Sequence, residues 1–238
     1  MKELKHLIFF ESLLEDTNNE LVRKAESEGD LAFGYTCFHA PEVLLNLGNC
    51  FSVRLRAPHT NSMELATYYM ANNSCEFSRA LLERALEGNY SFLHAMIGVD
   101  VCEANNRAIE NMEILHTQGE DKDKFFYCNL DIPYSDDEDC VEHIREQVSR
   151  KILKPMMENY GVDTSDTAIR ESVREHNEVC RILTEIGELR KLDIPPVTGY
   201  EYAVLVLVSY TCPKRLILPF LRETLEEIKA RRVDAEKN

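Results

Sequence analysis

The segment Ala32-Phe33-Gly34-Tyr35-Thr36 decides the fold class of this sequence. It is short, apolar and aromatic, and a run of this kind is typical of a β-strand. Three later segments have a similar texture, at residues 52–55, 92–99 and 125–130. Between them lie segments with helical composition, at residues 41–48, 76–87 and 104–116. Because strands that alternate with helices form βαβ units, the sequence predicts a parallel sheet of about four strands.

The pattern becomes helical from about residue 135 onward. Apolar residues recur every three or four positions from Val141 to Met156, and Ser135 with Glu138 has the spacing of a capping box before them. Further expected elements are a helix over residues 167–192, a segment 203–208 that is either strand or helix, and a last helix that opens at Pro219.

We therefore expect an α/β fold, with a Rossmann-like parallel sheet followed by a mainly helical segment. Residues 1–131 are expected to hold an N-terminal helical stretch plus the Rossmann-like domain, with residues 1–30 helical and peripheral. Residues 132–238 are expected to form the helical region.

Composition and charge exclude several functions. The 238 residues include 27 Lys+Arg against 42 Asp+Glu, a net charge of −15, so we expect no nucleic-acid partner. The longest apolar run, residues 203–208, is far shorter than the ~20 residues that span a bilayer. Lys2 and Lys5 precede no signal-peptide core. We therefore expect a cytoplasmic protein without a membrane partner.

The sequence contains eight cysteines but none of the common catalytic or cofactor motifs. There is no Gly-x-Gly, no His-Glu-x-x-His, no Gly-x-Ser-x-Gly, and no pair of cysteines separated by two residues. In a reducing compartment disulfides are not expected. Each cysteine is therefore a buried small residue, a metal ligand or a reactive thiol.

Three cysteines occupy related places in the expected topology. Cys37 follows the first strand, Cys102 follows the strand at residues 92–99, and Cys75 directly precedes a helix. The carboxyl ends of parallel strands meet at one edge, and helix N-termini favour thiolates, so the three sulfurs can converge on a soft metal or an iron–sulfur cluster. Arg79 and Arg107 follow where they can balance negative charge. The alternative is that the three cysteines are core residues, as free cysteines usually are.

The other cysteines are interpreted without a chemical role. Cys128, Cys180 and Cys212 are expected in the core, and Cys50 and Cys140 are expected as packing or surface residues.

These residues resemble the 2-hydroxyacyl-CoA dehydratase family, which includes the related benzoyl-CoA reductase subunits. The resemblance spans residues 31–200, most of the chain, and depends on the order and spacing of several short pieces. They are Gly34-Tyr35-Thr36-Cys37, Pro41-Glu42, Val53-Arg54-Leu55, Cys75 with Arg79, Cys102-Glu103 with Arg107, Leu189-Arg190-Lys191, and Pro195-Pro196 with Gly199.

The resemblance implies an α/β domain, a helical segment and a second α/β domain, with an oxygen-sensitive 4Fe–4S cluster held between the two domains. By resemblance, Cys37, Cys75 and Cys102 are the expected cluster ligands here. This chain ends near where the second domain would start, so we expect that domain to be missing from it. Either the chain is a truncated paralogue, or a second polypeptide supplies the remaining ligand and half of the acyl-CoA pocket.

Three functions follow from the resemblance and stay open at this point. The first is an iron–sulfur subunit that eliminates water from a 2-hydroxyacyl-CoA by reductive radical chemistry, after an ATP-dependent iron–sulfur activator supplies an electron. The second is a subunit like those of benzoyl-CoA reductase, in which the electrons stay in the product. The third is a non-catalytic partner that keeps the first domain for assembly. A second subunit or a homodimer is expected, and the sequence does not identify the acyl group.

Overall fold

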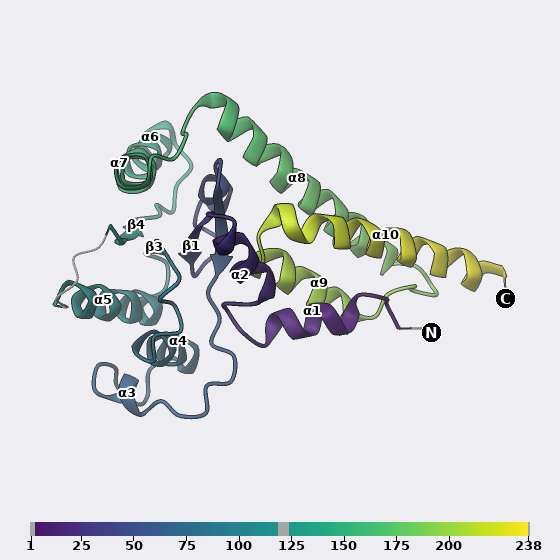
Figure 1. The fold of residues 1–238 in the computed structure, drawn as a ribbon, viewed down its shortest axis with the longest axis horizontal. Coiled ribbons are helices and arrows are strands. Elements are labelled where there is room, and N and C mark those ends of the chain that lie inside the picture. Colours follow the sequence, from purple (N-terminus) through teal and green to yellow (C-terminus); the bar gives the residue numbers. More distant parts are fainter. Residues whose placement is uncertain (1–2, 119–123, 238) are drawn as a thin grey trace.

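A four-stranded parallel sheet organises the computed structural model, which describes residues 3–118 and 124–237 (Figure 1). The strands are β1 (Leu31–Tyr35), β2 (Cys50–Arg54), β3 (Ala95–Val99) and β4 (Phe126–Leu130), in the order β2-β1-β3-β4. The predicted α/β fold is confirmed. The expected strand at residues 92–99 begins three residues later than predicted, because Phe92 lies in a turn.

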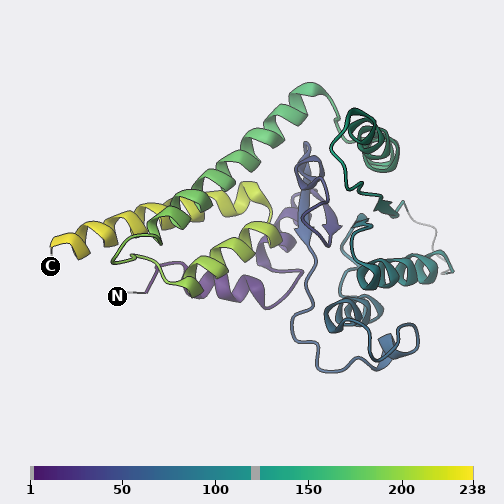
Figure 2. The same ribbon diagram turned by 180° about the vertical axis from the view of Figure 1, so that it is seen from behind.

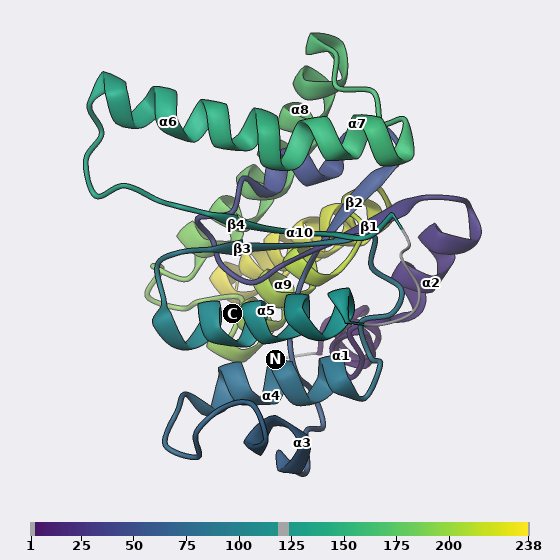
Figure 3. The ribbon, with the colours of Figure 1, turned by 90° about the vertical axis from the view of Figure 1, so that its left-hand side faces the viewer.

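Helices cover both faces of the sheet (Figure 3). They are α4 (Glu76–Leu86) and α5 (Glu103–Thr117) on one face, and α6 (Glu138–Val148), a π-helical turn (Ser149–Leu153) and α7 (Lys154–Tyr160) on the other. Alternate residues of β1 serve the two faces: Ala32 is buried with Leu81 of α4, and Phe33 is buried with Met156 of α7. This alternation follows from the two-residue period of a strand. The connections also contain the 3-10 helix η1 (Glu42–Asn46) and the short helix α3 (Glu64–Thr67).

A helical bundle extends away from the sheet (Figure 2). Its helices are α1 (Leu7–Leu14), α8 (Asp166–Leu189), α9 (Gly199–Thr211) and α10 (Lys214–Lys237), while α2 (Glu20–Ser27) packs beside β1. Phe10 and Leu13 of α1 are buried in one cluster with Leu205 of α9 and Ile217 of α10. The expectation that residues 1–30 are peripheral is therefore wrong for α1, whose apolar face completes the bundle core.

Residues 203–208, which fit either a strand or a helix, lie within α9. Thr198 begins this helix: its hydroxyl accepts a hydrogen bond from the Glu201 amide, and the Glu201 carboxylate accepts one from the Thr198 amide. Among the described residues, no helix has both the length and the apolar character needed to cross a membrane.

Two predicted helix starts are wrong. The last helix begins at Lys214, and Pro219 lies inside it, where its ring removes one backbone hydrogen bond. The cap of α6 is Asp137 rather than Ser135, because the Asp137 carboxylate accepts a hydrogen bond from the Cys140 amide at 2.9 Å. Ser135 instead donates its hydroxyl to Asp137. A charged acceptor is the stronger cap.

A buried ion pair joins the sheet to the bundle. Lys214 at the start of α10 places its Nζ 2.6 Å from Oε1 of Glu42, with both side chains less than a tenth exposed. Ser52 of β2 and Asn46 of η1 donate hydrogen bonds to the same oxygen, at 2.7 and 3.1 Å. His176 of α8 places Nδ1 3.0 Å from the other oxygen. One carboxylate therefore connects η1, β2, α8 and α10.

Removing one side of this ion pair leaves a buried charge without its partner. We expect Lys214→Met to lower the free energy of unfolding by about 3–5 kcal/mol, measured by urea denaturation. Lys191→Met is the matched control, because Lys191 bonds to Glu188 at the exposed surface and such pairs contribute little. Equal effects of the two substitutions would contradict a structural role for the pair.

Acid should weaken the same connection. Burial by itself raises the pKa of Glu42, but the hydrogen bonds and charges from His176, Lys214 and Ser52 outweigh it and lower the pKa from 4.5 to about 2. The ionised carboxylate therefore stabilises the fold above about pH 4.5, and this contribution is lost as the pH falls toward 2. We expect the urea midpoint to decline across that window, and to decline less steeply in Glu42→Gln. If the urea midpoint of Glu42→Gln fell with pH as steeply as that of the wild type, the Glu42 carboxylate would not be the source of the acid sensitivity.

Candidate functional site

The three predicted ligand cysteines all lie at the carboxyl edge of the sheet. Cys37 comes two residues after the end of β1, and Cys102 comes three residues after the end of the adjacent strand β3. Cys75 and Cys102 are the N-cap residues of α4 and α5. Figure 3 shows α4, α5 and α6 starting on the same side of the molecule, where β3 and β4 end. The topology therefore brings the three cysteines to one edge of the sheet.

Exposure divides the eight cysteines, all of which are free. Cys75 and Cys102 are exposed and Cys37 is half-buried. Burial raises the pKa of the Cys50, Cys128 and Cys212 thiols to about 12. The interpretation of Cys128 and Cys212 as core residues is confirmed. It is wrong for Cys180, which is exposed on α8.

Cys75 is the thiol best prepared to ionise. The backbone N–H of Ser78 in the first turn of α4 lowers the pKa of Cys75, with further help from the Ser78 hydroxyl and the Phe77 N–H. Cys140, near the start of α6, behaves in the opposite way: its hydrogen bond to the Asp137 carboxylate raises its pKa. Cys37 places Sγ 3.6 Å from Nδ1 of its neighbour His39.

The sulfurs are not gathered into a finished metal site. Across residues 3–118 and 124–237, no group of three or more His, Cys, Asp or Glu side chains is arranged to hold a metal ion. The chemistry of the donor set nevertheless fits an iron–sulfur cluster: three accessible thiols on one edge, one of them favouring the thiolate. Cys37, Cys75 and Cys102 therefore stay predicted ligands.

The two arginines expected to balance cluster charge have other partners. Arg79 is buried and donates to the carbonyl and side-chain oxygens of Asn72 and to the hydroxyl of Thr67. It thereby fixes the loop that leads into Cys75. Arg107 pairs with Glu110 at 2.7 Å and with Glu103 at 3.8 Å on its own helix.

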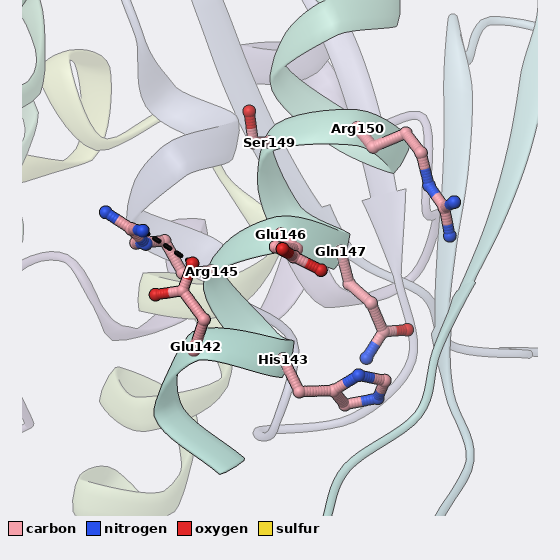
Figure 4. Close-up of a pocket in the computed structure, with 7 residues that line it drawn as sticks. All are labelled: Glu142, His143, Arg145, Glu146, Gln147, Ser149 and Arg150. Carbon is pink, nitrogen blue, oxygen red and sulfur yellow. Dashed lines mark hydrogen bonds and ion pairs between the residues drawn. The ribbon is translucent and has the colours of Figure 1, made fainter. Parts of the chain in front are cut away.

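A charged hollow of about 550 Å³ lies along α6, and it has no counterpart in the sequence analysis (Figure 4). Its lining contains no cysteine. Figure 4 shows His143 and Gln147 pointing to one side, away from the ion pair of Arg145 with Glu142. His143 bonds to Asp131 at the end of β4, and Gln147 pairs with the Asp131 backbone. These contacts anchor α6 to the sheet.

A smaller cleft of about 290 Å³ lies between the segment after β1 and the helices α8 and α9. Its lining residues are Tyr35, Phe38, Ala40, Pro41, Glu42, Val43, His176, Cys180 and Tyr210. His176 and Cys180, which lie side by side in this cleft, were not predicted from the sequence as a functional pair. Their four-residue separation on one helix was the available signal, since residues so spaced share a face.

Comparison with known proteins identifies the family of this chain. The family model for 2-hydroxyglutaryl-CoA dehydratase, D-component, matches residues 37–238. The chain belongs to this dehydratase family. The match begins at Cys37 and includes Cys75 and Cys102, so all three predicted ligands lie within the family region.

A curated relative of the dehydratase family is similar over most of this chain. It is the (R)-phenyllactyl-CoA dehydratase beta subunit of Clostridium sporogenes, 18% identical over 221 residues. The alignment covers 93% of this chain and 57% of the relative. The chain therefore spans a little over half the length of this relative. The resemblance seen in the sequence is confirmed at the level of the dehydratase family.

The opposite pKa shifts of Cys75, which is exposed, and Cys140, which is half-buried, give a direct test of the site. We expect iodoacetamide at neutral pH to alkylate Cys75 faster than Cys140, because alkylation needs the thiolate and the two pKa values shift in opposite directions. Peptide mass spectrometry after timed quenching measures both rates in one sample. Buried Cys128 serves as the internal control and should react only on unfolding. Faster labelling of Cys140 would contradict the assigned role of the α4 N-terminus.

Proposed function

We propose that the chain is an iron–sulfur subunit of a 2-hydroxyacyl-CoA dehydratase, with Cys37, Cys75 and Cys102 as ligands of a 4Fe–4S cluster. One observation carries the proposal: the family match contains three accessible cysteines, and the topology places all three at the carboxyl edge of the sheet. Open α/β sheets bind their ligands at this edge. When bound, the cluster would supply the low-potential electron that labilises the 2-hydroxyl group of the thioester.

The protein's own residues would prepare that edge. The N-terminus of α4 stabilises the Cys75 thiolate. The thiol proton, which must leave before Cys75 can bind a metal, is therefore lost more easily. Arg79 restrains the loop before Cys75 through Asn72 and Thr67. Glu42 fixes the far end of the segment that begins with Cys37.

The proposal includes partners. The relative is named as the beta subunit of its dehydratase, so we propose that this chain also works with a second subunit, which would complete the cluster ligands and the acyl-CoA site. An ATP-dependent iron–sulfur activator would deliver the electron. The relative's name favours dehydration over the reductase alternative. The free state of all eight cysteines suits a reducing, cytoplasmic setting.

Anaerobic reconstitution with iron and sulfide tests the cluster. We expect the wild-type chain, with any co-purifying subunit, to gain iron, sulfide and a visible thiolate-to-iron absorption. Single serine substitutions of Cys37, Cys75 and Cys102 should lose most of that absorption, whereas Cys140→Ser, another accessible thiol, should keep it. Full cluster loading in a chain with all three cysteines replaced by serine would contradict the ligand assignment. Absence of cluster loading in the wild-type chain would favour the alternative that the chain is a non-catalytic partner.

Turnover tests the reaction. With activator, ATP and a panel of 2-hydroxyacyl-CoA thioesters under strict anaerobiosis, we expect enoyl-CoA formation only when a second subunit is present. Liquid chromatography of the CoA products distinguishes water loss from net reduction. Dehydration by this chain alone would contradict the need for a partner.

A further inference from the structure

The cleft beside α8 contains a Cys–His–Glu series of side chains. Cys180 Sγ lies 3.3 Å from Nε2 of His176, and Nδ1 of His176 lies 3.0 Å from Oε2 of Glu42, which is an ion-pair distance without hydrogen-bond alignment. All three residues line the same cleft of about 290 Å³. A thiol, an imidazole and a carboxylate in this order form the arrangement in which the imidazole removes the thiol proton and the carboxylate orients the ring.

The carboxylate in this series is held rigidly. Oε1 of Glu42 is engaged by Lys214 and Ser52, which leaves Oε2 facing His176. Partial burial raises the pKa of Cys180, so at neutral pH the thiol is protonated and depends on a neighbouring base to become a nucleophile. His176 is the base within reach.

A second observation points to a ligand in the cleft. Tyr35 lines it with a side chain that is 1% exposed, and its hydroxyl has no hydrogen-bond partner within the described residues. A buried hydroxyl without a partner is costly, and a bound acceptor would satisfy it. The remaining lining is mostly apolar, with Phe38, Ala40 and Val43 beside the tyrosine. A ligand that fits this cleft has an oxygen acceptor near the Tyr35 hydroxyl and a short hydrocarbon chain along the apolar wall. A small acyl group has both.

We propose that the cleft is an acyl-transfer site at which Cys180 accepts a short acyl group from a thioester. The Cys180 sulfur attacks the thioester carbonyl carbon while His176 takes the thiol proton. The Tyr35 hydroxyl donates a hydrogen bond to the carbonyl oxygen as negative charge develops on it. The carbon–sulfur bond to the original thiol then breaks, and His176 returns the proton to the leaving thiolate. The products are S-acyl-Cys180 and a free thiol, with no change of oxidation state.

The choice of a thioester as the acyl donor rests on the proposed function, whereas the reactive Cys180 does not. The two can be tested apart, because acyl transfer needs neither iron nor reductant and can be followed in air. A chain with Cys37, Cys75 and Cys102 all replaced by serine should still acylate Cys180. Loss of acylation together with the cluster would show that the cleft belongs to the cluster site and would overturn the separate role of Cys180.

The experiment incubates the purified full chain with butyryl-CoA and follows intact mass, free CoA and the acylated peptide. We expect one butyryl group on Cys180, none in Cys180→Ser, and a rate about 100-fold lower in His176→Gln, since general-base assistance contributes at least that factor. Tyr35→Phe should slow the reaction by a similar factor of about 100. The Cys140→Ser variant, which removes a thiol outside the cleft, should be acylated at Cys180 at the wild-type rate.

Two outcomes would overturn the proposal. One is acylation of Cys75 and Cys102 at the same rate as Cys180, because equal rates would mean that any exposed thiol is acylated without help from the cleft. The other is an unchanged rate in His176→Gln. Iodoacetamide labelling of Cys180 gives a second readout without a thioester: it should slow in His176→Gln and stay unchanged in Tyr35→Phe. Circular dichroism of each variant checks that the fold is retained.

Discussion

The buried carboxylate of Glu42 is the interaction on which the rest of the structure depends. The hydrophobic cluster of the bundle is distinct from the two clusters that flank the sheet, and they meet at α8 and at Leu216 of α10, where a specific polar connection adds to the apolar contact. Glu42 provides it, because Lys214 of α10, His176 of α8 and Ser52 of β2 all converge on its two oxygens. A charged pair this deeply buried is stable only when every partner is in place. The segment after β1 is therefore fixed at Glu42 with little freedom.

That constraint positions both chemical features described here. Cys37 and Glu42 are the two ends of one short connection, so the cysteine edge and the α8 cleft share a wall. Arg54 of β2 stacks over Phe38 at 3.8 Å and further holds this wall against Tyr210 of α9. A substitution that loosened the Glu42 connection would disturb the predicted cluster ligand and the cleft together.

The sequence predicted the sheet well and the bundle less well, for physical reasons. Each strand is a short apolar run between polar turns, and a buried parallel strand looks this way whatever surrounds it. The role of α1 depended on partners more than two hundred residues away, such as Ile217, which local pattern does not reveal. Pro219 usually signals a helix start, but α10 begins at Lys214, directly after Pro213, whose carbonyl accepts hydrogen bonds from the Leu216 and Ile217 amides. The chain therefore offered two prolines as helix starts, and the earlier one is used.

The candidate site was also predictable only where the order of strands and helices determines a position. The edge position of Cys37, Cys75 and Cys102 follows from topology alone, since strand ends and helix starts meet there. The Cys180–His176 pair was visible as a four-residue spacing, yet its meaning depends on Glu42, which precedes His176 by more than a hundred residues. The spacing of Arg79 and Arg107 from cysteines did not reveal their neighbours: Arg79 donates hydrogen bonds to the neutral Asn72, and Arg107 pairs with Glu110.

The three edge cysteines differ in how firmly their backbones are held, and this bears on how they would close around one ligand. Glu42 anchors the segment that follows Cys37, and Arg79 anchors the loop that precedes Cys75, so both are tied to buried charged groups. Asp100, two residues before Cys102, bonds through its side chain to Asn106 of α5 and through its amide to the Leu130 carbonyl at the end of β4. Val101 and Cys102 follow this anchor and are both exposed. Because an exposed turn adjusts at lower cost than a loop tied to a buried charged group, the approach of the three sulfurs should come mainly from the Cys102 side.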